Sequence, residues 1–268
     1  MPDILHLSDI HFGSPHRAEA SASLASWVAA DPPDLVVASG DQTQRAKPRE
    51  FEQALSFLEQ IDAPFLAVPG NHDVPQFRVW ERWLAPLAAY RKHFNNDLEP
   101  VFENHKIFVV GVNSAIRSTV KDGRVTRNQR QRLATRLASA GDRWKVVVLH
   151  HELVPGPDAS ARKTLSGAAG LADILAEFEV DLVLSGHLHI SYQAWLRDYY
   201  PHLNYDVPLL HAGSASSTRG RGRERNRSSC FRIRLQDETV RVQRFRFDPL
   251  AKRFAADLQW SWPRHAQG

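Results

Sequence analysis

The 268-residue sequence is poor in residues that form crosslinks or membrane spans. Its single cysteine, Cys230, excludes an internal disulfide and a cysteine-based zinc site, and we expect it to be a buried or half-buried strand residue. No stretch approaches the roughly 18 to 20 apolar residues that cross a bilayer, so no membrane partner is expected. The apolar N-terminus is interrupted by Asp3, His6 and Asp9 and has no basic leader. It therefore does not resemble a secretory signal, and a cytoplasmic location is expected.

A large excess of charge of one sign is also missing. The sequence has 34 lysines and arginines against 30 aspartates and glutamates, a net charge of +4. This bias fits an enzyme of anionic substrates and an ordinary soluble protein equally well. Hydrophobic residues make up 43% of the chain, enough for a sizeable core. Because we find no linker-like composition and no internal repeat, we expect one domain over residues 1–268.

Five short apolar runs recur along the chain, and each ends in polar residues. They cover residues 4–7, 35–38, 65–68, 145–149 and 182–184. Short, β-branched, almost uniformly apolar runs are typical of strands buried on both faces. Helical spacing of apolar residues lies between them, at residues 24–28, 48–61, 133–137 and 171–178. This alternation predicts parallel pairing with helical cover, and ligand binding where the carboxyl ends of the strands converge.

The pattern changes after residue 189. Residues 190–196, 208–211, 230–235 and 239–247 are expected to be strands without intervening helices. In the third of them, Phe231, Ile233 and Leu235 alternate with polar residues, as in a half-exposed strand. These strands predict a second, more antiparallel sheet packed on the first. The expected domain then has a metal-ligand-bearing βα part (1–189), followed by mainly antiparallel second-sheet strands and a tail (190–268).

An ordered set of polar motifs follows the five apolar runs. The motifs are Asp9-x-His11, Gly40-Asp41, Gly70-Asn71-His72-Asp73, His150-His151 and Gly186-His187-x-His189. Taken alone, none is decisive, because Asp-x-His arises often by chance and Gly-Asp is a common turn. Together they place carboxylate, amide and imidazole groups behind five predicted strands, and these groups are metal ligands.

This order of motifs resembles the calcineurin-like metallophosphoesterase superfamily, whose signature is D-x-H, G-D, G-N-H-[DE], H and G-H-x-H. The resemblance extends from about Asp3 to at least His189. Within the superfamily the chain is most similar to the bacterial class III cyclic-nucleotide phosphodiesterases and their uncharacterised relatives, through its Leu-Ser-Asp-Ile-His opening and residues 212–214, Ala-Gly-Ser. The implied fold is α/β, a four-layer α-β-β-α sandwich of two facing mixed β-sheets flanked by helices.

The resemblance also implies a centre of two divalent transition-metal ions per chain. One ion would be bound by Asp9, His11, Asp41 and His189, and the other by Asp41, Asn71, His150 and His187. Asp41 would thus bridge the two ions. Mixed imidazole and carboxylate ligands suit manganese, iron or zinc better than calcium or magnesium.

Two neighbouring histidines and an aspartate are candidates for other roles at this centre. His72 follows a ligand directly and is the expected catalytic group, as an acid or as a stabiliser of phosphoryl oxygens. Asp73 would orient His72 through a hydrogen bond, with a turn cap as the alternative. His151 would contact substrate or support its loop.

An arginine-rich segment and several tryptophans are the remaining unusual features. Residues 214–227 carry the arginines Arg219, Arg221, Arg223, Arg225 and Arg227. They form either an anion-binding lip, with Arg219 as the substrate contact, or a solvated loop. The tryptophans expected in the core are Trp27, Trp80, Trp83 and Trp144. Trp260 and Trp262 would anchor the tail or form the surface of a homodimer.

The implied function is hydrolysis of small phosphodiesters such as cyclic nucleotides, by in-line attack of a hydroxide shared between the two metals. A DNA-repair-type nuclease is the alternative within the same chemistry. Nucleic acid is not the favoured partner, because the arginine-rich segment contains few interleaved aromatic residues. A phosphomonoesterase, a pyrophosphatase and a non-catalytic interaction module remain less favoured alternatives.

Overall fold

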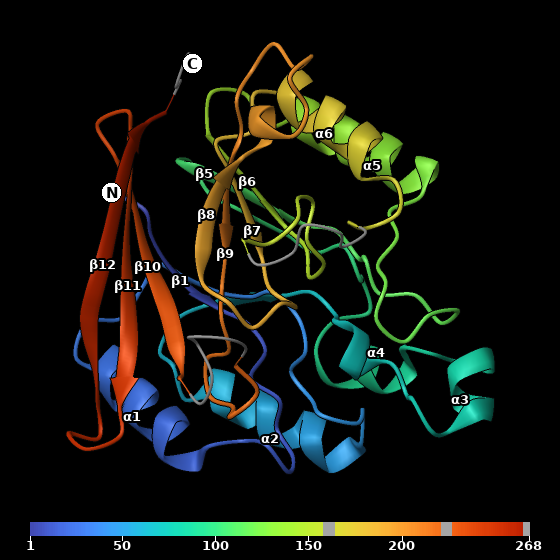
Figure 1. Ribbon diagram of the computed structural model, residues 1–268, viewed down its shortest axis with the longest axis vertical. Helices are drawn as coiled ribbons and strands as arrows, with labels where there is room; N and C mark the ends of the chain where they lie inside the picture. Colours follow the sequence, from blue (N-terminus) through green and yellow to red (C-terminus); the bar gives the residue numbers. More distant parts are fainter. Residues whose placement is uncertain (158–163, 221–226, 265–268) are drawn as a thin grey trace.

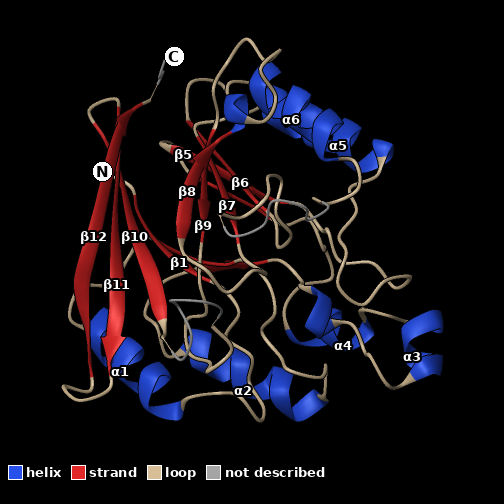
Figure 2. Cartoon of the chain, viewed as in Figure 1, coloured by secondary structure: helices blue, strands red, loops and turns tan. Residues whose placement is uncertain are grey.

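The computed structural model describes residues 1–157, 164–220 and 227–264. These residues form two six-stranded sheets with helices on both sides (Figures 1 and 2). The first sheet has the order β12-β11-β10-β1-β2-β3, and its strands are β1 (Asp3–Leu7), β2 (Leu35–Ala38), β3 (Phe65–Ala67), β10 (Ser229–Gln236), β11 (Thr239–Asp248) and β12 (Arg253–Pro263). The second has the order β4-β5-β6-β7-β9-β8, and its strands are β4 (Val101–Glu103), β5 (Ile107–Gly111), β6 (Trp144–Val148), β7 (Leu182–Ser185), β8 (Tyr192–Trp195) and β9 (Pro208–His211).

The helices lie in the segments that connect these strands. They are α1 (Ala18–Ala29), α2 (Pro48–Glu59), α3 (Val79–Leu84), α4 (Ala88–His93), α5 (Arg127–Ala138) and α6 (Ala168–Glu177), with short 3₁₀ helices η1 (Asn71–Asp73) and η2 (Leu196–Asp198). The expected helices around residues 24–28, 48–61, 133–137 and 171–178 are confirmed as α1, α2, α5 and α6. Over the described ranges, no helix is both long and apolar enough to span a membrane.

Three apolar cores separate four layers. Between the sheets, Ile4 of β1 belongs to the same core as Val146 of β6. The next residue of β1, Leu5, faces the other way and packs with Leu24 of α1 and Leu58 of α2. A third core joins the second sheet to α5 and α6. Both faces of these central strands are buried, and most of their residues are apolar. The expected α-β-β-α sandwich of mixed sheets is confirmed.

The division of strands between the sheets differs from the prediction. The five motif-bearing strands do not share one sheet: β1, β2 and β3 belong to the first, whereas β6 and β7 belong to the second. The later strands do not form a sheet of their own either. β9 pairs in parallel with β7, and β10 pairs antiparallel with β1. Local patterns do not contain this information, because a buried strand looks the same beside either neighbour. The assignment of one domain stays a prediction.

Two tryptophans expected in the core are on the surface. Trp80 and Trp83 lie on α3 with 81% and 50% of their surface exposed, so the prediction for them was wrong. Trp144 is buried, and Trp27 is half-buried against Phe245. The sequence did not predict α3, because a six-residue helix shows too little periodicity.

One strand near the C-terminus differs from the prediction. Residues 253–263 form β12, a strand that was not predicted. Trp262 is buried in the core between the sheets, which matches the anchoring alternative for the tail. A homodimer through this region stays a prediction. Cys230 is buried in β10, as expected.

Candidate metal centre

The predicted ligands lie on the loops that leave β1, β2, β3, β6 and β7, where the carboxyl ends of strands from both sheets meet. Five of them have left-handed backbones: Asp9, His11, Asp41, His187 and His189, with φ between 51° and 77°. Such a conformation costs a non-glycine residue about 1 to 2 kcal/mol. Strain of this kind is retained mainly where a site requires it, so the cluster itself indicates a functional centre.

Gly40, just before Asp41, allows the loops of the two sheets to meet. Its φ is +104°, which favours glycine, and a side-chain carbon there would overlap the ring of His150. The loop after β2 in the first sheet therefore touches the loop after β6 in the second only because this residue has no side chain.

The first ligand cluster consists of Asp9, His11, Asp41 and His189. Each offers one ligand atom, and all four atoms lie within 4.8 Å of one another. The Nε2 atoms of His11 and His189 are 3.3 Å apart, and Oδ1 of Asp9 lies 3.3 Å from Nε2 of His189. This Oδ1 atom is buried and has no hydrogen-bond partner among the described residues. A buried carboxylate oxygen facing two imidazole nitrogens fits a cation between them.

The other oxygen of Asp9 is held from outside the cluster. Its Oδ2 accepts hydrogen bonds from Ser8 Oγ at 2.7 Å and from the backbone N–H of His187 at 2.9 Å. Burial alone would raise the pKa of Asp9, but His189 and His11 hold that pKa below its ordinary value. The residue therefore remains a carboxylate, with Oδ1 directed at the cluster.

Asp41 connects the two halves of the site. Its Oδ2 atom lies 3.6 Å from Nε2 of His11 and 3.4 Å from Nε2 of His150. Its Oδ1 atom accepts a hydrogen bond of 2.7 Å from the backbone N–H of His72. Burial opposes ionisation, but the neighbouring histidines, with His150 foremost, lower the pKa of Asp41 well below its usual range. One charged oxygen therefore faces a histidine of each candidate ligand cluster.

The second cluster forms around Asn71. Its Oδ1 atom lies 2.9 Å from Nδ1 of His187 and 3.2 Å from Nε2 of His150. Its Nδ2 donates to the carbonyl of Val120 at 3.0 Å, which directs the amide oxygen toward the histidines. Nδ1 of His150 lies 2.9 Å from the carbonyl of Ser39, which leaves Nε2 to bind a metal.

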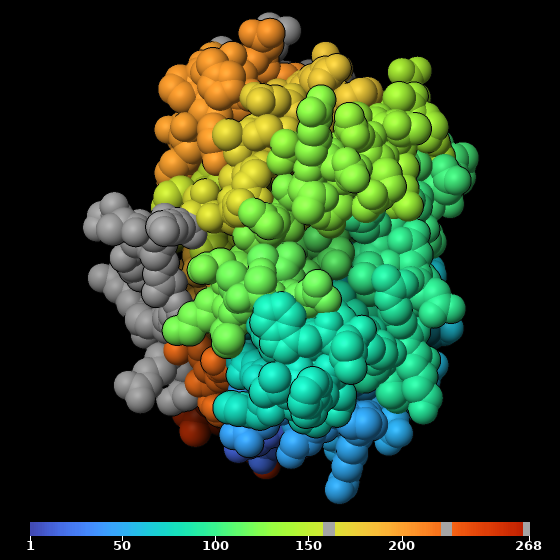
Figure 3. Space-filling view, turned by 90° about the vertical axis from the view of Figure 1, so that its right-hand side faces the viewer, coloured from blue at the N-terminus to red at the C-terminus, as the bar shows by residue number. Residues whose placement is uncertain are grey.

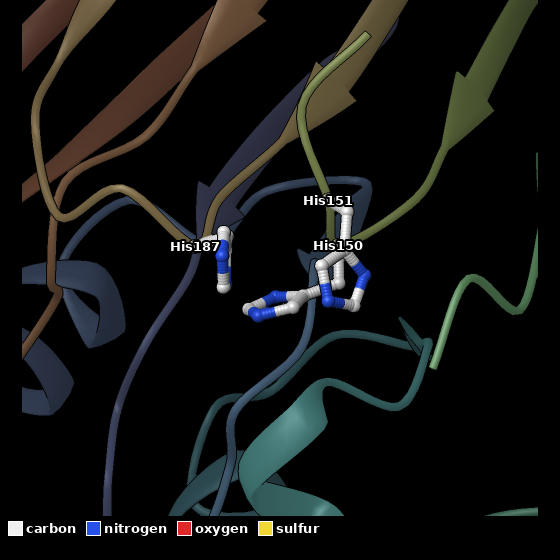
Figure 4. Close-up of side chains that lie close together, drawn as sticks. All are labelled: His150, His151 and His187. Carbon is white, nitrogen blue, oxygen red and sulfur yellow. The ribbon is translucent and has the colours of Figure 1, made fainter. Parts of the chain in front are cut away.

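His151 lies beside the candidate ligands but belongs to neither predicted ligand set. Together with His150 and His187 it forms a group of three imidazoles that could hold an ion; the three rings gather where the loops after β6 and β7 meet (Figure 4). Burial lowers the pKa of His151 to about 3, so its ring is neutral. Its Nδ1 lies 2.8 Å from Ser114 Oγ, and this contact ties the loop after β5 to the end of β6. That matches loop support, and contact with substrate stays a prediction.

His72 lies next to the first cluster with its ring edge-on to that of His11. Its Nδ1 is 2.8 Å from the carbonyl of Gln44, and its Nε2 is 3.0 Å from Nη1 of Arg219. Because arginine only donates, Nε2 accepts and the ring proton is on Nδ1. Burial lowers the pKa of His72, although the charge of Asp41 opposes this. His72 is therefore a neutral imidazole with its lone pair toward Arg219.

Asp73 does not have the predicted contact with His72. Its carboxylate instead accepts hydrogen bonds from the backbone N–H groups of Gly70 and Thr43 and from Thr43 Oγ1, each at 2.9 Å. The carbonyl of Gln44 orients His72, a role that no side-chain motif could reveal. Asp73 is thus the turn cap that the sequence left as the alternative. Burial and the nearby Asp41 raise its pKa to about 6.

Arg219 reaches the site from the arginine-rich segment. Besides His72, its Nη1 contacts Oε1 of Gln44 at 3.1 Å. The start of the segment is attached to the first motif, since Ser214 Oγ donates to the carbonyl of Asp9 at 2.7 Å. Arg227 is exposed. The other arginines of the segment, Arg221, Arg223 and Arg225, lie outside the described residues.

The sequence of this chain is similar to those of several known phosphodiesterases. A probable glycerophosphodiester phosphodiesterase GpdQ of Arcobacter nitrofigilis is 29% identical over 61% of this chain and 59% of its own. The 3',5'-cyclic adenosine monophosphate phosphodiesterase CpdA of Haemophilus influenzae is 26% identical over 58% of this chain and 54% of its own. The matched region thus spans less than two-thirds of these curated relatives.

The fold and the sequence point to one family. Purple acid phosphatase PPD1 of yellow lupin superimposes with a TM-score of 0.74 at 11% identity, covering 98% of this chain and 53% of its own, which shows a shared fold. The family model for calcineurin-like phosphoesterases matches residues 2–191, most of the chain. The chain therefore belongs to the calcineurin-like phosphoesterase family.

Proposed function

We propose that this chain is a phosphodiesterase with two divalent transition metals, and that it hydrolyses small diesters such as cyclic nucleotides. The observation that carries the proposal is the position of Asp41 Oδ2 between His11 and His150. A carboxylate oxygen shared by two ligand clusters is the element that a two-metal centre requires and a single-metal site does not. The relatives named above, which act on phosphodiesters, support the reaction class.

The proposed ligands of one ion are Asp9, His11, Asp41 and His189, and those of the other are Asp41, Asn71, His150 and His187. Two such ions, when bound, supply positive charge to the phosphate oxygens and lower the pKa of a bound water. Imidazole, carboxylate and amide donors fit manganese, iron or zinc.

The remaining groups would act on the substrate side. Arg219 has the charge and the fork-shaped donors that bind a phosphate oxygen, and it lies 3.0 Å from the His72 ring. A phosphate oxygen that accepts from the guanidinium of Arg219 replaces the hydrogen bond from Arg219 to Nε2 of His72. The phosphate also places an anion beside Nε2. The anion favours the protonated ring, so Nε2 can take up a proton from solvent and donate it to the leaving alkoxide.

Metal analysis and chelation test the proposal directly. We expect about two transition-metal ions per purified chain, measured by inductively coupled plasma mass spectrometry. Chelation should abolish hydrolysis of bis-p-nitrophenyl phosphate, cyclic AMP or both, and added manganese should restore it. Single-stranded DNA and p-nitrophenyl phosphate in the same assay distinguish a nuclease and a phosphomonoesterase. A chain that binds no metal and hydrolyses none of these substrates would instead be a scaffold.

Replacing Arg219 by alanine is expected to raise KM for good diester substrates by about tenfold, since the residue would donate to a charged phosphate oxygen. The metal content should not change, because Arg219 donates only and is not a ligand. Arg227→Ala, at the exposed far end of the same segment, is the matched control and should behave as wild type. An unchanged KM for every good substrate would remove Arg219 from the site.

A further inference from the structure

Helix α3 and Phe77, which lies just before it, expose large apolar side chains. Phe77, Val79, Trp80, Trp83 and Leu84, here called the α3 ridge, are all exposed, with Trp80 and Leu84 each at about 80%. Single exposed apolar residues are ordinary, but a contiguous group indicates a surface that contacts something apolar. In Figure 1, α3 lies at the outer edge of the molecule, beyond α4 and away from both sheets, and the same region faces the viewer in Figure 3.

The buried and exposed faces of α3 are the reverse of those of an ordinary surface helix. Its buried residue is Arg82, which donates to the carbonyl of Pro75 at 3.0 Å and to that of Thr119. A surface helix normally buries its apolar face and exposes its charges. Here an arginine anchors α3 to the protein through backbone carbonyls, and the two tryptophans face outward. The outward position of the ridge is therefore fixed by hydrogen bonds.

Cationic groups surround the ridge. The guanidinium of Arg45 lies 5.6 Å from the centre of the Phe77 ring, and that of Arg117 lies 5.5 Å from the centre of the Trp83 ring. A pocket of about 660 Å³ beside Trp83 is lined by Arg91, Arg117 and Arg124, among other residues.

The acidic residue of α3 does not offset these charges. Glu81 forms an ion pair with Arg78, with Nε and Oε1 2.6 Å apart. The ridge and its surroundings therefore combine exposed apolar side chains with positive charge.

Two short segments connect the ridge to the candidate metal centre. Arg45, which covers Phe77, directly follows Gln44, whose carbonyl orients His72. On the other side, Arg82 of α3 donates to the carbonyl of Thr119, and the carbonyl of the next residue, Val120, accepts the hydrogen bond from Asn71. A partner bound to the ridge would thus lie next to the site.

We propose that the α3 ridge docks this protein onto the surface of a bilayer that contains anionic phospholipid. Tryptophan, phenylalanine and leucine enter the boundary between headgroups and acyl chains, while nearby arginines meet the anionic headgroups. Single-stranded nucleic acid fits less well, because Val79 and Leu84 offer no ring on which a base could stack. A second copy fits less well too, since a stable dimer buries about 800 Å² per partner, more than one six-residue helix supplies.

Docking of this kind departs from the expectation of no membrane partner. That expectation rested on the lack of a spanning segment, which a peripheral surface does not need. Docking also does not depend on the proposed chemistry, because the ridge contains none of the metal ligands. The two proposals can therefore fail separately.

The test compares vesicle binding of two matched variants of the full chain. Co-sedimentation uses vesicles of phosphatidylcholine alone and of phosphatidylcholine mixed with phosphatidylglycerol. We expect wild type to bind the anionic vesicles and Trp80→Asp to bind them about tenfold more weakly. Leu250→Asp, at a 95% exposed leucine in the turn between β11 and β12, is the control and should bind like wild type.

The other outcomes overturn the proposal. If wild type does not bind the anionic vesicles, or Trp80→Asp binds them as well as wild type, the ridge is not a membrane surface. Loss of single-stranded DNA binding or of self-association in Trp80→Asp, with vesicle binding intact, would assign the ridge to nucleic acid or to a second copy. Metal content and hydrolysis of soluble bis-p-nitrophenyl phosphate should match wild type in both variants, which separates loss of docking from loss of folding or of the proposed function.

Discussion

Asp41→Asn is expected to empty both halves of the metal centre at once. In the native chain, Oδ1 of Asp41 accepts the backbone N–H of His72, and Oδ2 faces both His11 and His150. An asparagine that keeps its oxygen on the His72 N–H turns its amide N–H₂ toward both ligand clusters. The substitution therefore removes a negative charge and places donors where the two proposed ions would require an acceptor.

The expected result is coordinated loss of the two metals, with kcat/KM reduced on the order of 10³-fold. Metal content by mass spectrometry and activity on bis-p-nitrophenyl phosphate measure it. The control is Asp181→Asn, which also removes a buried carboxylate but lies directly before β7, paired with Arg264. That variant should lose stability and keep both metals. Loss of only one metal from Asp41→Asn would show that Asp41 is not a bridge.

The sequence predicted that the candidate ligands would lie at strand ends but not how the strands would pair. Apolar runs that end in Asp9, Asp41 or His150 are local patterns, and each does lie at a strand end. Pairing of β10 with β1 joins residues more than 200 positions apart, and no local pattern records it. For the same reason, the meeting of two sheets at the site appeared only in the structure.

The sequence did not reveal the hydrogen bonds that orient the candidate site histidines, for a different reason. Backbone carbonyls of Ser39 and Gln44 orient His150 and His72, and a carbonyl carries no residue-type signal. The tryptophans of α3 were misplaced because a core is the usual location for large aromatic residues. Here the buried position belongs to Arg82, which reverses the usual rule.

His72→Ala should lower kcat on the order of 10²- to 10⁴-fold for a diester with an alkoxide leaving group, such as cyclic AMP. The side chain lies beside the proposed ligands without being one, so metal content should stay at the wild-type value. The neutral ring, with Nε2 toward Arg219, is the form expected before substrate binds. The negative charge of a phosphate between them would favour the protonated ring, with the proton taken up from solvent.

The leaving group decides which role His72 has. An alkoxide is a strong base and needs a proton as it departs, whereas p-nitrophenolate is a weak base and leaves without one. If His72 donates that proton, the loss in His72→Ala should be far smaller for bis-p-nitrophenyl phosphate than for cyclic AMP. His202→Ala, at an exposed histidine paired with Asp173, is the control and should leave both rates unchanged. Equal losses for the two substrates would mean that His72 stabilises phosphoryl oxygens, and loss of metal would mean that it is a ligand.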